Sequence, residues 1–285
     1  MNSFYKAFED QFRGSRTLIK ERLRAYTPFI QALKELDRNC KAIDLGCGRG
    51  EWLELLTEHG FDAIGVDLDE GMLSDCKALG LKTEKANALD KLANQANESV
   101  ALITGFHLAE HLSNSDLQQL IQESFRALIP GGLLILETPN TENITVATIN
   151  FYFDPSHIRP IPAKLLQFLT QHIGFARSKI LGLQESSELK DGKKTPTLFQ
   201  VLNDASPDYA IVAQKSCSEK EWGLFNAAFD QHFGLSLDGL AARYDSAIAH
   251  QFHHTQAQLN ELQIILKPLI RLRKLKNRIL AYIRG

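Results

Sequence analysis

The sequence predicts an α/β fold with a seven-stranded, mostly parallel β-sheet, helices on both faces and a helical C-terminal extension. Apolar runs typical of buried strands alternate five times with helical or turn patterns between residues 42 and 137. Two later apolar runs, at 174–184 and 208–214, would complete the sheet. Strand–helix alternation indicates a parallel sheet, and such sheets bind ligands at the carboxyl ends of their strands. We therefore expect the functional residues at those ends.

The composition is typical of an ordered protein with one main domain and an appendage. The chain has 285 residues, of which 44% are hydrophobic and 23% are charged. Its four cysteines include no Cys-x-x-Cys pair, and a chain of this length needs no disulfide framework. The sequence shows no signal-peptide core and no apolar run near the ~20 residues that span a bilayer. We therefore expect a cytoplasmic protein.

Charge is distributed unevenly along the chain. The formal net charge is -2, yet residues 267–285 contain no acid and seven cations, namely Lys267, Arg271, Arg273, Lys274, Lys276, Arg278 and Arg284. The remainder is acidic and has no basic stripe, which argues against nucleic acid as a partner because phosphate contacts need cations. We expect a helical lid or cap at 1–40, a sheet domain at 41–216 and a helical extension with a basic tail at 217–285.

The N-terminal segment is predicted to form two helices over residues 3–36, broken near Gly14, with Ser15 as the N-cap of a helix at 16–26. The segment is unusually basic, through Arg13, Arg16, Lys20, Arg22 and Arg24. One interpretation is a solvated helix that covers a sheet edge. The other is a lid whose arginines bind an anionic ligand, since the planar guanidinium group suits carboxylate and phosphate.

A glycine-rich turn joins the first strand to the helix after it. The run from Asp44 places glycine at Gly46, Gly48 and Gly50, which permits positive φ and close approach of a ligand to the backbone. The dinucleotide fingerprint is excluded because its third glycine would fall on Glu51, and a Walker loop is excluded because Gly-Lys-Ser/Thr is missing. Asp-x-Gly-x-Gly-x-Gly after a strand resembles motif I of the class I S-adenosylmethionine (SAM) dependent methyltransferases. The resemblance implies their Rossmann-like fold and SAM as cofactor.

The next strands carry further candidate cofactor contacts. The second strand ends in Asp67, where an α/β nucleotide site places the carboxylate that binds the ribose hydroxyls, and Asp69 could compete for this role. After the third strand, Asn87 stands where the methyltransferase pattern commonly has Asp beside the adenine, and Asn can still hydrogen-bond the base. Asp44 would face the ammonium side of SAM. The expected cofactor contacts also include neighbours at the strand ends, namely Cys47, Leu68, Ala88, Gly105 and Phe106.

Two clusters of candidate catalytic residues follow the later strands. The first, after the strand at 100–104, contains His107, Glu110 and His111, whose helical spacing would place the two histidines side by side. The spacing also resembles an inverted zinc motif, but that class needs a distant third ligand and a different fold, so we expect no zinc site. The second cluster lies in an insertion at 150–162 and contains Tyr152, Asp154 and His157.

Methyl transfer from a sulfonium to a hydroxyl requires alignment of donor and acceptor and removal of a proton. Histidine suits proton transfer near neutral pH, so we expect His111 or His157 as the base, oriented by Asp154 or Glu110. Alternatively, Asp154 only caps the turn before His157, and His111 only caps or packs at a helix start. A divalent metal held by Glu110, Asp154 and a histidine is a further alternative, because metals also activate sugar hydroxyls.

The remaining elements are expected in the order helix 115–128, turn 130–132, strand 133–137, helix 163–172, strand 174–184 and strand 208–214. The polar stretch at 185–196 predicts a mobile loop. From Ser218 the pattern is helical, with a break and cap at 235–238. Apolar residues then recur at spacings of three and four, which predicts a helix–helix seam and allows a homodimer through Leu259, Leu262 and Leu266.

Pro268 is expected to interrupt this helical seam. Beyond it the basic tail carries an apolar face formed by Leu269, Leu272, Ile279 and Ile283. Such a helix could bind the inner face of the cytoplasmic membrane, dock on a protein partner or pack within the chain.

Beyond the cofactor pattern, the chain resembles methyltransferases encoded in bacterial O-antigen and other surface-polysaccharide gene clusters. The resemblance covers most of 5–184 and rests on residues 12–16, 19–24, 104–107, 110–112, 128–135, 137–140, 142–143, 151–152, 154–155 and 157. It implies an O-methyltransferase whose acceptor is a sugar or a lipid-linked glycan. Glu-His after strand four is shared with methyltransferases of quinone precursors, so a small-molecule acceptor is an alternative. A SAM-binding scaffold without turnover at the membrane is another.

Overall fold

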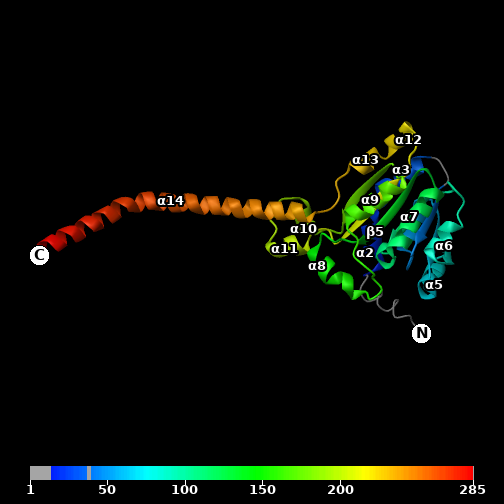
Figure 1. Ribbon diagram of the computed structural model, residues 1–285, viewed down its shortest axis with the longest axis horizontal. Helices are drawn as coiled ribbons and strands as arrows, with labels where there is room; N and C mark the ends of the chain where they lie inside the picture. Colours follow the sequence, from blue (N-terminus) through cyan, green and yellow to red (C-terminus); the bar gives the residue numbers. More distant parts are fainter. Residues whose placement is uncertain (1–13, 37–39, 285) are drawn as a thin grey trace.

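A seven-stranded sheet forms the centre of the body, and one long helix extends away from it (Figure 1). The computed structural model describes residues 14–36 and 40–284. The helix expected before Gly14, with Arg13, lies outside the described residues.

The strands lie in the order β3-β2-β1-β4-β5-β7-β6. Strands β1 to β5 pair in parallel, and β7 is antiparallel to both β5 and β6. Their bounds are β1 Lys41–Leu45, β2 Asp62–Asp67, β3 Thr83–Lys85, β4 Val100–Phe106, β5 Leu128–Pro139, β6 Arg177–Leu183 and β7 Asp208–Gln214. This confirms the predicted seven-stranded, mostly parallel sheet. The strand order reverses between β1 and β4, the kind of switch point at which parallel sheets bind ligands.

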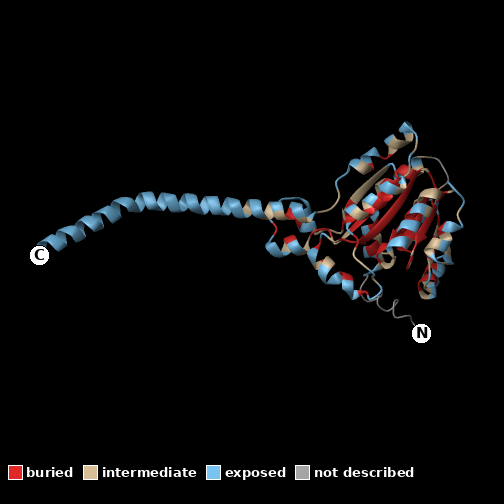
Figure 2. Cartoon of the chain, viewed as in Figure 1, coloured by how far each residue is buried: buried red, intermediate tan, exposed pale blue. Residues whose placement is uncertain are grey.

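Helices cover both faces of the sheet, and the strands between them are buried (Figure 2). The first face packs against α2 Arg16–Leu23, η1 Arg24–Tyr26, α3 Thr27–Glu35, α4 Glu51–Glu58, α5 Glu70–Ala78 and α13 Asn226–Asp230. The second face packs against α6 Ala88–Ala93, α7 Asn114–Ala127 and α9 Ala163–Ile173. Each helix contributes apolar residues to one of two core layers, because a sheet buried on both faces needs an apolar helix face on each side.

The N-terminal helix begins at the predicted cap. The Ser15 hydroxyl accepts a hydrogen bond from the Leu18 N–H at 3.3 Å. The chain then passes from α2 through the 3-10 turn η1 into α3 without the single long helix expected at 16–26. Pro28, in the first turn of α3, fits this boundary because proline lacks the N–H that a helix interior needs.

Strand β5 starts earlier than predicted and includes the expected turn at 130–132. Gly131 has a φ of +79°, and its N–H donates to the carbonyl of Lys215 at 3.2 Å. The pairing with β4 shifts its register between Val100 and Leu102. The Pro-Gly-Gly sequence is therefore an irregularity within a strand, where a glycine adopts the unusual backbone and the missing proline N–H is tolerated.

The stretch between β6 and β7 is not an open loop. It contains α10 Ser187–Lys190 and α11 Leu198–Asn203. The Leu189 side chain is fully buried and packs with Val201, Ala205 and Leu240. Arg243 donates to the Leu189 carbonyl at 2.9 Å. The prediction of a mobile polar loop at 185–196 is wrong because one buried leucine anchors this stretch to the base of the long helix.

The C-terminal part begins with α12 Glu219–Leu224 and α13, and Phe225 between them is buried in the core of the body. Helix α14 then spans Leu237–Arg284, 48 residues. It starts at the predicted cap, where the Ser236 hydroxyl accepts from the Gly239 N–H at 3.1 Å.

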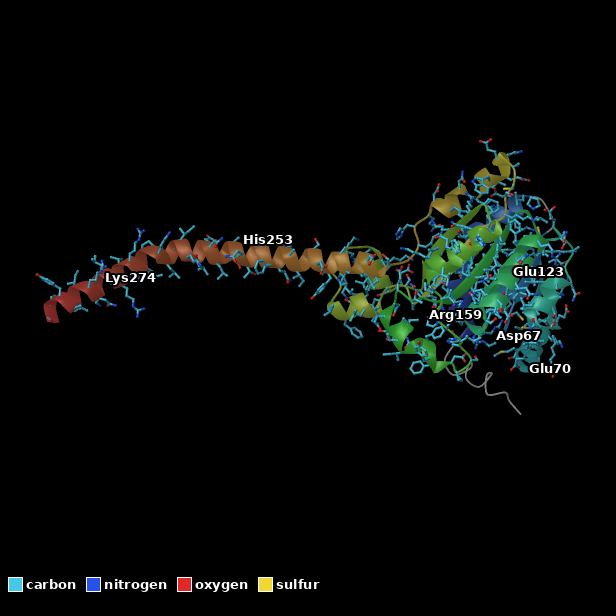
Figure 3. The ribbon with its side chains drawn as sticks, in the orientation of Figure 1. Asp67, Glu70, Glu123, Arg159, His253 and Lys274 are labelled. Atoms are coloured by element: carbon cyan, nitrogen blue, oxygen red, sulfur yellow. The ribbon has the colours of Figure 1, made fainter. Side chains whose placement is uncertain are left out.

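Helix α14 continues through Pro268, so the predicted interruption is wrong. A proline within a helix removes one hydrogen bond and costs about 3 kcal/mol, but an exposed helix can bend around it. Every side chain from residue 248 to 283 is exposed (Figure 2). His253 and Lys274 lie along this helix, far from Asp67 in the body (Figure 3). No helix within 14–36 and 40–284 is long and apolar enough to cross a membrane.

Candidate active site

A cavity of about 850 Å³ lies at the carboxyl ends of the parallel strands. Its walls come from the turns after β1, β2, β3 and β4, from the end of β5, from α2 and from η3 Asn150–Phe153 in the insertion. This is the predicted position for a ligand in a parallel α/β sheet. The volume lies in the range of small-molecule and cofactor sites.

One part of the cavity, here called the cofactor half, is built from the glycine turn and the ends of neighbouring strands. The expected residues that line it are Gly46, Gly48, Asp67, Leu68, Asn87, Ala88 and Phe106. Gly46 and Gly48 have φ values of +68° and +50°, which glycine adopts without steric cost. Because both glycines line the cavity, their bare backbone leaves room for a bound ligand. This cradle fits a cofactor such as SAM.

Asp67 links the turn after β1 to the end of β2. Its two carboxylate oxygens accept from the N–H groups of Gly48 and Asp69, each at 2.9 Å, and the residue lines the cavity. Asp69 instead uses its carboxylate to cap α5, where it accepts from the Gly71 N–H at 2.7 Å. Both aspartates line the cavity, so the choice of Asp67 as the group that binds ribose hydroxyls remains a prediction.

Asn87 also has two roles. Its side-chain oxygen accepts from the Leu89 N–H at 2.8 Å and so caps α6. The residue also lines the cavity beside Ala88, where its amide group can face a bound base.

Four residues expected to contact the cofactor lie behind the cavity lining, namely Asp44, Cys47, Gly50 and Gly105. The Asp44 carboxylate is buried and accepts from the Thr104 hydroxyl at 2.7 Å. Gly50 begins α4 with a φ of +80°, and a Cβ there would lie 2.7 Å from Cys76 Sγ. These residues shape the turn from inside the protein rather than lining the cavity.

The basic residues of α2 divide between two faces. Arg16 pairs with Glu54 of α4 at 2.6 Å, and Lys20 pairs with Glu58 at the same distance. These pairs bind α2 to α4, as expected for a covering helix. Arg22 lines the cavity, as expected for a lid. Helix α2 therefore covers a face of the sheet rather than its edge, and the binding of an anionic ligand by Arg22 remains a prediction.

The other part of the cavity, here called the polar half, is lined by imidazole and carboxylate groups, namely His107, His111, Glu137, Asp154, His157 and Asp208. Glu110 belongs to η2 Ala109–His111, immediately behind this lining, and is fully buried. One Glu110 oxygen lies 3.2 Å from Nδ1 of His107, and the other accepts from the Thr138 hydroxyl at 2.8 Å.

Burial and hydrogen bonding shift the pKa values of Glu110 and His107 in opposite directions. Burial raises the pKa of Glu110, but the hydrogen bond and charge of His107 outweigh it and leave the pKa of Glu110 below its ordinary value. Burial lowers the pKa of His107, but hydrogen bonds to Glu110 and Glu137 raise the pKa well above its ordinary value. The pair therefore favours an imidazolium beside a carboxylate.

His157 is held in a defined tautomer. Its Nδ1 lies 2.6 Å from the Phe151 carbonyl, which can only accept, so Nδ1 carries the proton and Nε2 remains an acceptor. That Nε2 lies 3.8 Å from a carboxylate oxygen of Asp154. The ring of His111 packs on that of His157, with centroids 4.7 Å apart.

Asp154 caps its turn as well as facing His157. It accepts from the Ser156 N–H at 2.8 Å and from the Ser156 hydroxyl at 2.5 Å. Burial raises the pKa of Asp154, but these hydrogen bonds outweigh it and lower the pKa overall. The proposed turn cap is thus confirmed, and it holds an ionised carboxylate at the cavity wall.

Tyr152 is not part of this arrangement. It lies in η3 but is 65% exposed and does not line the cavity, unlike Asn150 and Phe153 of the same turn. Our expectation of a catalytic role for Tyr152 is therefore not supported, because the turn directs its ring away from the cluster.

Three residues of the site were missed by the sequence analysis, namely Tyr26, Glu137 and Asp208. Glu137 lies near the end of β5, and Asp208 begins β7 opposite Pro139. The Tyr26 hydroxyl donates to Glu137. Burial, together with the charges of Glu137 and Glu110, raises the pKa of Asp208 to about 7 against the opposing charge of His107. The one signal for these residues in the sequence is the acid at the end of strand five, Glu137.

Two groups of residues among those the structure describes have geometry suited to a metal ion. The groups are Glu110, His111 and His157, and His107, Glu137 and Asp208, with candidate ligand atoms within 4.8 Å of one another in each. Asp154, which we considered as a ligand, belongs to neither group.

Comparison with known proteins identifies the family. Residues 18–178 match the family model described as a methyltransferase domain. A probable S-adenosylmethionine-dependent methyltransferase of Mycolicibacterium smegmatis is 27% identical over 149 residues, 52% of this chain and 57% of that protein. A ubiquinone biosynthesis O-methyltransferase of Methylococcus capsulatus is 32% identical over 117 residues, 39% of this chain and 48% of that protein. The chain thus spans about half the length of these curated relatives.

A solved structure of a SAM-dependent methyltransferase from Archaeoglobus fulgidus is similar over its whole length. It is 30% identical, with a TM-score of 0.65, and the match covers 75% of this chain and 100% of the other. The matching domain contains both the glycine turn and the histidine-rich turn after β4. With the cavity geometry, these matches show that the chain belongs to the SAM-dependent methyltransferase family and is an enzyme that uses SAM.

Proposed function

We propose that this enzyme transfers a methyl group to a hydroxyl of a sugar during the biosynthesis of O-antigen or another surface polysaccharide. The observation that supports this most is the polar half of the cavity, where three imidazoles and three carboxylates meet. A sugar offers several hydroxyl donors, which carboxylates and neutral imidazoles accept. The residues on which the resemblance to surface-polysaccharide methyltransferases rests include His107, His111, Glu137, Asp154 and His157, which line this half.

SAM, when bound, supplies an electrophilic methyl group on its sulfonium. In this proposal Asp67 binds the ribose hydroxyls, Asn87 hydrogen-bonds the adenine edge, and Arg22 pairs with the carboxylate of the methionine part. Each of these side chains lines the cavity. Phe106, which precedes His107 in the chain, also lines the cavity.

His157 is the proposed base. The Phe151 carbonyl holds its Nδ1–H, so Nε2 can take the proton of the acceptor hydroxyl. Asp154 at 3.8 Å and Glu110 at 4.0 Å from Nε2 would stabilise the imidazolium that forms. His111, packed against His157, is the alternative base.

His157→Ala and His111→Ala test this assignment. Both variants should bind SAM like the parent protein in isothermal titration calorimetry, since both residues lie in the polar half. Turnover should fall by about 10²–10⁴-fold in His157→Ala, the usual contribution of a general base, and much less in His111→Ala. The opposite result would make His111 the base, and full turnover in both variants would exclude both.

The turnover assay uses labelled SAM and lipid-linked glycan from the source cell, followed by location of the methyl group on the glycan. Label in a sugar hydroxyl supports the proposal and excludes a scaffold without turnover. Label confined to another compound class contradicts the sugar acceptor.

A quinone precursor is the second candidate acceptor. It is favoured by the 32% identity to a ubiquinone biosynthesis O-methyltransferase of Methylococcus capsulatus, although that match covers 39% of this chain. A demethylated quinone precursor with its polyprenyl chain, added to the same assay in place of glycan, distinguishes the two acceptors.

We also propose that the basic tail, residues 267–285, holds the enzyme at the inner face of the cytoplasmic membrane. Leu269, Leu272, Ile279 and Ile283 recur at helical spacing and are each more than half exposed. Lys267, Arg271, Lys274 and Arg278 recur at the same spacing on another face. A helix with an exposed apolar face and a cationic face suits the surface of an anionic bilayer. A lipid-linked acceptor would be presented at the same surface.

A further inference from the structure

Three potential ligands meet at the ends of three adjacent strands. His107 follows β4, Glu137 lies on β5, and Asp208 begins β7, and these strands are neighbours in the sheet. Their candidate ligand atoms lie within 4.8 Å of one another, and all three residues line the cavity. The His107 N–H also donates to the Glu137 carbonyl at 2.9 Å, which fixes the two backbones together. The cluster is therefore a product of the sheet and does not depend on a loose loop.

The His107 ring is oriented from behind. Its Nδ1 lies 3.2 Å from the fully buried Glu110 carboxylate, which is itself held by the Thr138 hydroxyl at 2.8 Å. With Nδ1–H donating to Glu110, Nε2 faces Glu137 at 3.5 Å. Histidines that bind metals usually donate their other ring N–H to a carboxylate or carbonyl, because this fixes the tautomer and ring orientation. Glu110 fills that supporting position.

Glu137 is oriented in the same way. The Tyr26 hydroxyl, buried in the core, donates to one Glu137 oxygen and leaves the other facing Nε2 of His107. The Gln184 amide donates to this second oxygen at 3.4 Å, and a carboxylate oxygen has a further lone pair that can bind another group. Within residues 14–36 and 40–284, no hydrogen-bond donor pairs with the Asp208 carboxylate.

The cluster also carries more negative than positive charge. The carboxylates of Glu110, Glu137 and Asp208 face two cations within the described residues, the His107 imidazolium and Arg22. A metal ion at Nε2 of His107 would displace the proton of that nitrogen, because only a neutral imidazole is a ligand. Buried carboxylates need a counter-charge, and a divalent cation would supply it. Two carboxylates with one imidazole suit Mg²⁺ or Mn²⁺, whose remaining coordination positions would be open toward the cavity.

We propose that His107 Nε2, Glu137 and Asp208 bind one divalent cation, Mg²⁺ or Mn²⁺, at the inner end of the polar half. The cation would contact an oxygen of the methyl acceptor through its open positions and hold that oxygen beside the cofactor half. Cation binding itself does not require that the acceptor be a sugar. The cation site can therefore be tested without the acceptor, and it can be correct even if the acceptor is not a sugar.

Mn²⁺ titration of the full-length protein, followed by electron paramagnetic resonance, tests the site without SAM or acceptor. The parent protein should bind one Mn²⁺ per chain. Asp208→Asn and Glu137→Gln should each weaken Mn²⁺ binding at least tenfold, because each replaces an anionic carboxylate ligand with a neutral amide of nearly the same shape. His111→Ala and Asp154→Asn are the matched controls, since both residues line the same half but lie outside the cluster, and they should leave Mn²⁺ affinity unchanged.

A second measurement does not depend on how the acidic variants fold. Electron spin echo modulation of bound Mn²⁺ should show one coordinated ¹⁴N in the parent protein, retained in His111→Ala and His157→Ala and lost in His107→Gln. Loss of the signal in His111→Ala or His157→Ala would move the cation to the Glu110, His111 and His157 group and overturn the proposal. Absence of stoichiometric binding would also overturn it and would leave His107 as an imidazolium paired with Glu110 and Glu137.

Discussion

At the scale of single residues, the turn after β1 depends on glycine for two different reasons. Gly46 and Gly48 line the cavity, where a side chain would occupy ligand space. Gly50 lies on the inner side of the turn, where a Cβ would lie 2.7 Å from Cys76 Sγ and 2.8 Å from Leu81 Cδ1. The first two glycines therefore concern binding, and the third concerns packing and the start of α4.

Gly50→Ala should accordingly destabilise the fold. The left-handed backbone of the alanine should lower the free energy of unfolding by about 1 kcal/mol, and the forced contacts of its Cβ should lower it by about 1–3 kcal/mol more. Gly80→Ala is the matched control, because its φ is +74° and no atom lies within 4 Å of the added Cβ. Urea unfolding should show the larger loss for Gly50→Ala, and equal losses in the two variants would contradict the packing argument.

At the scale of elements, α2 serves both the core and the cavity. Its pairs with Glu54 and Glu58 join it to α4, and Tyr26, one turn beyond it, donates to Glu137 in the polar half. Arg22 lies on the same helix and lines the cavity. An element that covers one face of the sheet thus also contributes groups to the site.

Arg22→Ala should weaken SAM binding at least tenfold, or about 1.4 kcal/mol, because a guanidinium that faces the cofactor carboxylate would be lost. Arg24→Ala is the control, since Arg24 is exposed and pairs with Glu21 on the helix surface. Calorimetric titration of SAM measures both. Equal SAM affinity in the parent protein and in Arg22→Ala would contradict this role. Arg22 would then contribute to acceptor binding or to folding stability instead.

At the scale of the whole molecule, the body and α14 have different environments. The helix rises about 70 Å over its 48 residues, and most of its length contacts nothing in the described chain. Its anchor is the small cluster around Leu189 and Leu240. The exposed apolar residues beyond that cluster need a surface to cover them, and the cations of the basic tail favour an anionic one.

Truncation after Leu266 should abolish sedimentation with phosphatidylglycerol vesicles while leaving SAM affinity unchanged, because the basic tail is remote from the cavity. Phosphatidylcholine vesicles and high salt should each weaken binding of the full chain, since both reduce the electrostatic attraction. Unchanged sedimentation after truncation would contradict the membrane proposal. A shift from dimer to monomer in light scattering would instead assign α14 to pairing with a second copy.

Much of the fold and the cofactor half could be predicted because the signals are local. The glycine spacing, the acids that end strands and the alternation of strands with helices each lie within a few adjacent residues. The errors at Pro268, at 130–132 and around Leu189 have a common cause. Proline, glycine and polar residues favour breaks, but the strand pairing of β5, the burial of one leucine and the exposure of α14 override that local preference.

The polar half shows the limit most clearly. His107, Glu110, Asp154 and His157 were predicted as separate clusters, and the sequence by itself determined their chemistry together with the SAM-binding turn. Only the tertiary structure decided that Glu110 lies behind His107, that Tyr152 faces outward, and that Glu137, Asp208 and Tyr26 complete the site. The physical reason is topology: β7 runs back antiparallel beside β5, which brings the start of one strand to the end of another, and no spacing along the chain encodes that meeting.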